Sequence, residues 1–155
     1  MTKGFSLVEV LVSMAVIATS AAGLAELVVI ASRATQASRI DTAATFAAES
    51  KLAELRALSF VWDAASAPLT DPALAISPSS SLSTDAPGFI DYVDATGQRV
   101  AEGLPGSRVY VRRWSIQPLP ADPLNTLVLQ VVAAPMTTPR SRTVHLVSIL
   151  ARTAS

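Results

Sequence analysis

Cysteine is absent from the 155-residue sequence, and histidine occurs only once. The chain therefore has no disulfides, no thiolate metal ligands and no cysteine nucleophile in any cellular compartment. A single histidine cannot form a metal-binding pair, and the sequence contains neither a glycine-rich phosphate loop nor a G-x-S-x-G motif. We expect a fold held by packing alone and a protein that is not an enzyme and has no cofactor.

An excess of charge of either sign is also absent, because twelve basic residues balance twelve acidic ones. Binding to nucleic acid or to an anionic surface relies on a basic excess, so we do not expect a nucleic-acid partner. Charged residues make up 15% of the chain and hydrophobic residues 50%, and much of the hydrophobic excess lies in the first thirty residues. The length suits one compact domain with an additional extended element.

Proline is missing from the first 67 residues, so nothing interrupts a long helix before Pro68. From Phe5 to Ala25 the only charged residue is Glu9. As a helix this segment would be roughly 31 Å long, which matches the hydrocarbon core of a bilayer. The sequence therefore predicts a helix that can cross a membrane.

Two simple explanations of this segment compete. A secretory signal peptide would use Lys3 as its charged start and the small residues around Ala22 as a cleavage site, but only four residues precede the apolar stretch. A plain membrane anchor gains nothing from Glu9, because an unpaired carboxylate in hydrocarbon costs about 2.5 kcal/mol or more. Glu9 is therefore expected to have a partner.

The residues around Glu9 resemble a known motif. Gly4-Phe5-Ser6-Leu7-Val8-Glu9-Val10-Leu11-Val12 is similar to the cleavage and methylation motif of type IV prepilins and type II secretion pseudopilins. The resemblance implies that a prepilin peptidase cuts after Gly4 and methylates the new amino group of Phe5. It also implies that Glu9 pairs with the amino group of a neighbouring subunit's Phe5 during assembly. Such a pair would replace an isolated buried charge.

The expected fold class is α+β and pilin-like, with a long N-terminal helix packed on a small antiparallel sheet. Residues 1–4 would be the leader, 5–31 the membrane and filament-core half of the helix, and 32–60 its amphipathic half. A Pro/Ser/Ala-rich loop is expected over 61–88 and the sheet domain over 89–155. The segment from Phe46 to Leu58, FAAESKLAELRAL, is also similar to the corresponding helix of minor pilins and of pseudopilins that nucleate secretion filaments.

Spacing gives further detail within these segments. Apolar residues recur every three or four positions between Ile40 and Leu58, which predicts a stripe facing the sheet. The charged residues are expected as solvated surface, with Lys51 and Glu54 close enough to pair at i,i+3. Strands are predicted over 89–93, 98–101, 107–116, 126–133 and 142–151, with a turn at Asp94 to Gly97. An antiparallel meander is the simplest arrangement of these strands.

Three other groups of residues are candidates for chemistry. His145 alternates with apolar residues, which favours a surface or edge position over a catalytic one. A calcium loop at Asp85, Asp91 and Asp94 lacks the regular alternation of oxygen ligands, so no metal site is expected. Arginines at 108, 112 and 113 flank Trp114; a DNA-binding patch is one interpretation, but protection of a sheet edge is favoured.

These observations favour a minor pilin or pseudopilin that initiates or caps a filament. Major subunits commonly have a C-terminal cysteine pair, a helix-kinking proline or a calcium loop, and none of these is found here. The expected partners are the prepilin peptidase, other pilins or pseudopilins and the inner-membrane assembly platform. Lys3 would stay inside, with the C-terminal part extracytoplasmic or periplasmic. The alternative is a membrane-anchored extracytoplasmic binding module or enzyme outside any filament.

Overall fold

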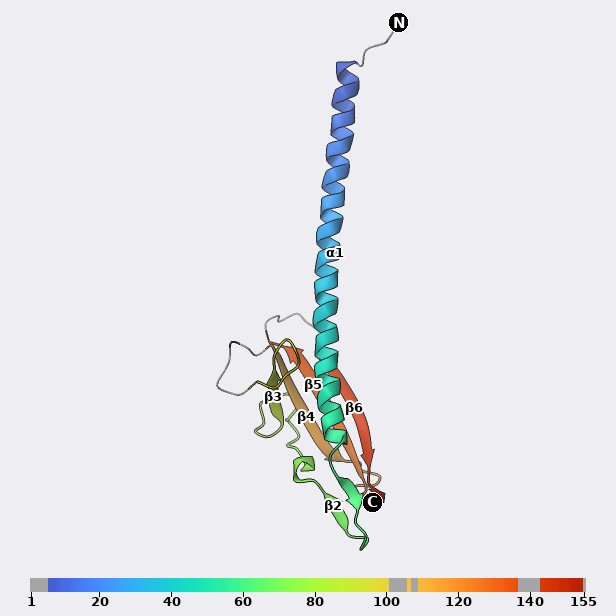
Figure 1. Cartoon of the computed structure of the whole chain (residues 1–155), viewed down its shortest axis with the longest axis vertical. Helices are drawn as coiled ribbons and strands as arrows, with labels where there is room; N and C mark the ends of the chain where they lie inside the picture. Colours follow the sequence, from blue (N-terminus) through green and yellow to red (C-terminus); the bar gives the residue numbers. More distant parts are fainter. Residues whose placement is uncertain (1–5, 101–105, 107–108, 137–142, 155) are drawn as a thin grey trace. The chain divides into compact units, whose positions relative to one another are not determined.

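The computed structural model describes residues 6–100, 106, 109–136 and 143–154. It contains one long helix, α1, followed by strands and the 3₁₀ turn η1 (Figure 1). In chain order the elements are α1 (Leu7–Arg56), β1 (Phe60–Trp62), β2 (Pro68–Thr70), η1 (Pro72–Leu74), β3 (Ile90–Val93), β4 (Tyr110–Pro118), β5 (Thr126–Pro135), β6 (Val144–Ala151) and β7 (Thr153–Ala154). The chain divides into two compact units, 1–39 and 40–155. The layout confirms the expected α+β class.

The main sheet of the second unit is a four-stranded antiparallel meander in the order β3-β4-β5-β6. Val131 at the centre of β5 pairs with Trp114 of β4 on one side and with Leu146 of β6 on the other. After β3 the chain turns through Asp94 to Gly97, and Gly97 adopts a φ of +83°, a left-handed conformation that glycine adopts readily. The predicted meander and turn are both confirmed. The strand predicted over 98–101 is not, because among its described residues only Arg99 forms a bridge, an isolated one with Val93.

A second, three-stranded sheet was not predicted from the sequence. β1 lies between β2, to which it is antiparallel, and β7, to which it is parallel. Arg152 holds this sheet together, donating hydrogen bonds to the carbonyl oxygens of Val61 (3.1 Å) and Leu69 (3.0 Å). Its guanidinium also lies 4.0 Å from the ring centroid of Phe60. The segment expected to be a loop therefore contributes part of a sheet.

The rest of that Pro/Ser/Ala-rich segment is fixed to the outer side of β4. The hydroxyl of Ser77 lies 3.0 Å from that of Ser115 and accepts a hydrogen bond of 3.0 Å from the backbone amide of Ile116. Gln117 donates to the carbonyl oxygen of Ser77 at 2.8 Å, and Ser81 is fully buried. Serine hydroxyls in this segment thus satisfy polar groups that the chain buries.

The core of the second unit forms where the last turns of α1 pack on the meander. The helix contributes Ala44, Ala47, Ala48 and Leu55, and the sheet contributes larger side chains such as Ile116, Leu129 and Val131. Alanines let the helix backbone approach the sheet closely, and the longer sheet residues fill the remaining space. The predicted apolar stripe is confirmed.

Lys51 was expected on the solvated side of the helix, and this prediction was wrong. Its residue is only 3% exposed, because it continues the row formed by Ala44, Ala47 and Ala48 toward Leu55. The Lys51 ammonium lies 3.1 Å from Glu54, 3.7 Å from Asp91 and 3.9 Å from the ring centroid of Trp114. Burial lowers the pKa of Lys51 below its usual value even though both carboxylates act in the opposite direction.

The assignment of the arginines to an exposed sheet edge was also wrong, because β4 is an interior strand. Arg112 is 3% exposed and faces the helix, where it donates two hydrogen bonds of 2.7 Å to Asp91 and one of 3.3 Å to the Ala47 carbonyl. Arg113 points to the other face and pairs with Asp85 at 2.7 Å. Arg108 lies outside the described residues.

Candidate functional site

The N-terminal half of α1 carries apolar side chains that nothing in the described chain covers. The large ones between Leu7 and Ile30 are each 47% to 76% exposed, and they occur on every side of the helix. An 18-residue window of α1 has a mean hydropathy of 2.0, and none of that window is buried. By length and composition this helix can cross a bilayer.

Polar groups inside this apolar segment are satisfied within the helix itself. Ser13 donates a hydrogen bond of 2.7 Å to the Glu9 carbonyl, and Thr19 donates one of 2.9 Å to the Ala15 carbonyl. Hydroxyls bonded back to the preceding turn tolerate a surrounding without water, because no donor is left unpaired. The segment therefore suits either lipid or the apolar surface of other helices.

Glu9 is the exception among these polar groups. It lies in the first turn of α1, where its backbone amide donates to the Ser6 carbonyl at 3.0 Å and its negative charge interacts favourably with the helix dipole. Its residue is exposed and forms no ion pair with any residue that the structure describes. The carboxylate is therefore available to a cation from another molecule.

The two other predicted site residues, Gly4 and Phe5, lie outside the described residues. The structure therefore gives no geometry for the cleavage and methylation site. The position of Glu9 only a few residues beyond Phe5 is known from the sequence alone. The proposed roles of all three residues stay predictions.

The three aspartates considered for calcium have separate partners. Asp85 pairs with Arg113, and Asp91 pairs with Arg112, Arg99 and Lys51. Asp94 accepts hydrogen bonds from the hydroxyl of Thr96 (2.7 Å) and from the amides of Thr96 and Gln98, and these bonds lower its pKa. Within the described ranges, no group of three acidic or histidine side chains is arranged to hold a metal ion.

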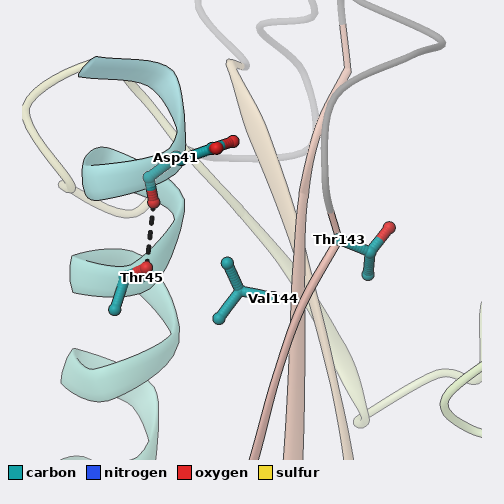
Figure 2. Close-up of a pocket in the computed structure, with 4 residues that line it drawn as sticks. All are labelled: Asp41, Thr45, Thr143 and Val144. Carbon is teal, nitrogen blue, oxygen red and sulfur yellow. Dashed lines mark hydrogen bonds between the residues drawn. The ribbon is translucent and has the colours of Figure 1, made fainter. Parts of the chain in front are cut away.

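The second unit has a pocket of about 270 Å³ between α1 and the start of β6. Figure 2 shows Asp41 and Thr45 on the helix and Thr143 and Val144 on the opposite side. The Thr45 hydroxyl is already used, because it donates to the backbone carbonyl of Asp41 at 2.9 Å.

His145, the next residue on β6, is exposed and lies 3.1 Å from Gln130, which confirms its predicted surface position.

Sequence reasoning predicted the Lys51–Glu54 pair, which is confirmed at 3.1 Å. It missed the rest of the ionic cluster that joins the helix to the sheet, formed with Asp91, Arg99 and Arg112. One signal of it was available. Lys51 falls four residues before Leu55 and three after Ala48, so the apolar spacing itself placed it on the buried face. The pairing of Arg112 with Asp91 depended on knowing that β3 and β4 are neighbours, with these two residues directly opposite each other.

In a comparison with known proteins, residues 1–25 match the family model described as the prokaryotic N-terminal methylation motif. No curated protein and no solved structure matches the chain. The match covers the residues that carry the resemblance noted in the sequence and indicates a prepilin-type N-terminus.

Proposed function

We propose that this chain is a minor pilin or pseudopilin, a structural subunit that a prepilin peptidase processes and that helps to initiate or cap a filament. The observation that carries this function is Glu9, a single carboxylate in the first turn of an exposed apolar helix, within the matched methylation motif. In a filament, both the apolar side chains and the carboxylate of that helix would have partners. Neighbouring helices cover the apolar side chains, and the amino group of a neighbouring Phe5 pairs with Glu9.

The remaining features support a filament subunit in a consistent way. The C-terminal turns of α1 are fixed to a sheet by packed alanines and by the Arg112–Asp91 pair. The N-terminal half of the same helix is left for lipid before assembly and for other subunits after it. The partners of such a subunit are the peptidase, other pilins or pseudopilins and a membrane assembly platform.

Substitution of Glu9 separates this function from that of an anchored module that belongs to no filament. We expect Glu9→Leu to be cut and methylated normally but to be missing from sheared filaments, because the cationic amino group has lost its partner. Glu49→Gln is the matched control, since it removes an exposed glutamate from the same helix. Incorporation of Glu9→Leu at the level of the control would contradict the proposed function.

A further inference from the structure

Two further charged residues interrupt the apolar character of α1, and neither has a role in the assembly described above. Glu26 follows the membrane-length segment, and Arg33 follows Glu26 by seven residues. Both are exposed, and neither has an ion-pair partner among the residues that the structure describes. Between them the helix carries only apolar residues and Ser32.

Seven residues of an α-helix make nearly two complete turns. Glu26 and Arg33 therefore point to the same side within about 20°, separated by about 10.5 Å along the axis. That distance is too long for a pair within one helix. Arg39, the next cation, lies about 140° away from Glu26 around the helix and cannot serve the same face.

We propose that Glu26 pairs with Arg33 of a second copy of this chain, in a parallel arrangement shifted along the helix by seven residues. Copies that share one membrane topology are parallel. Without a shift, Glu26 would face Glu26 and Arg33 would face Arg33, so like charges would repel. A shift of about 10.5 Å exchanges both repulsions for one attraction at the edge of the hydrocarbon, where water screens a charge pair less.

The side chains next to the pair fit the same shift. A seven-residue shift that joins Arg33 to Glu26 also places Ile30 of the first copy opposite Gly23 of the second. Gly23 has open space where a Cβ would stand, with no atom within 4 Å, so it can receive a large neighbour. Small residues of this kind allow helices to approach closely in a membrane or filament.

This pairing rests on the proposed filament role, and it adds a contact about 25 Å along the helix from Glu9. It requires only two adjacent copies, so it is compatible with a subunit of low abundance. The Glu9–Phe5 pair joins positions four residues apart and the Glu26–Arg33 pair joins positions seven apart, so the two pairs would join a subunit to different neighbours.

The absence of cysteine allows a direct test in membranes that contain the full chain. Two differently tagged copies are co-expressed, one with Gly23→Cys and the other with Ile30→Cys, and treated with a short bismaleimide. We expect a cross-link between the two tags. Introducing E26R into both copies should lower its yield about threefold or more, and E26R/R33E should restore it, because the swapped charges still attract.

Gly23→Cys in both copies is the control, since it reports unshifted pairs. The inferred pairing is overturned if that control cross-links as well as the shifted pair, if E26R has no effect, or if the charge swap fails to restore the yield. The N-terminal mass of the same samples tests the filament role separately. A methylated Phe5 start without a charge-dependent cross-link would contradict only the pairing, and a Met1 start with the cross-link would contradict only the filament role.

Discussion

At the scale of single residues, the Asp91 carboxylate organises the contact between α1 and the sheet. Its side chain is 10% exposed and has Arg112 at 2.7 Å, Arg99 at 3.2 Å and Lys51 at 3.7 Å. Three cations, from α1, from the segment after the turn and from β4, therefore meet one anion. The Lys51 ammonium also lies over the ring of Trp114. A charge held in this way stabilises one position of the helix on the sheet, since any shift leaves a buried charge unpaired.

Removing Arg112 should therefore be far more damaging than removing its neighbour. We expect Arg112→Met to lower the free energy of unfolding by about 3 kcal/mol, because Asp91 loses its two shortest hydrogen bonds. Arg113→Met removes a pair whose aspartate is 60% exposed and should cost less than about 1 kcal/mol. Urea unfolding of the detergent-solubilised full chain measures both. Equal losses would show that the buried pair does not fix the helix.

Asp94 should give the turn after β3 a pH dependence. The hydrogen bond from the Thr96 hydroxyl, followed by those from the backbone amides of the turn, lowers the pKa of Asp94 below its ordinary value. The folded turn is therefore stabilised at pH values above the ordinary pKa of an aspartate, and this contribution is lost as the pH falls through the lowered pKa of Asp94. The amide chemical shifts of Thr96 and Gln98 should follow that loss in the wild type. In Asp94→Asn they should not, and identical pH profiles for both proteins would refute this role.

At the scale of elements, α1 changes character along its length while remaining a single helix. Its N-terminal half exposes large apolar side chains on all sides, and its C-terminal half buries one row of small ones.

The close packing of this buried row can be tested by enlarging one of its side chains. Ala48 is 0% exposed, so Ala48→Leu places a larger side chain in a filled space. We expect this overpacking to lower the free energy of unfolding by about 2 kcal/mol. Ala53→Leu, on the exposed side, should be close to neutral, and a similar cost at both positions would contradict the packing described.

The elements also show where reasoning from sequence succeeds. The helix and the three long strands were predicted because their periodicity continues over many residues, as in the alternation of Leu127, Leu129 and Val131. The sheet formed by β1, β2 and β7 was missed because these strands have two or three residues each, too few for a pattern. Arg112 was misassigned because its burial depends on which strands are neighbours, and the sequence does not state that order.

For the candidate site, the sequence identified more of the residues than the structure did. Gly4, Phe5 and Glu9 were identified from their order and spacing, and Phe5 and Gly4 lie outside the described residues. The structure adds that Glu9 lies in the first turn of a helix with exposed apolar sides. It does not supply the partner of Glu9, because that partner belongs to another molecule.

At the scale of the whole molecule, a subunit that initiates or caps a filament should have a defined place in it. We expect antibody or gold label on the C-terminal unit, residues 40–155, to be found at one end of each filament. A major subunit labelled in parallel should decorate the full length. Uniform decoration by this chain would contradict the terminal position while leaving its incorporation intact.

The central claim is that this chain enters the prepilin pathway, and the N-terminal mass of the membrane-extracted protein tests it most directly. The chain is expressed with and without a prepilin peptidase, and the N-terminal peptide is measured in each case. We predict a chain that begins at N-methylated Phe5 when the peptidase is present and at Met1 when it is absent. A chain that begins at Met1 in both cases, or near Ala22 in both, would contradict the account.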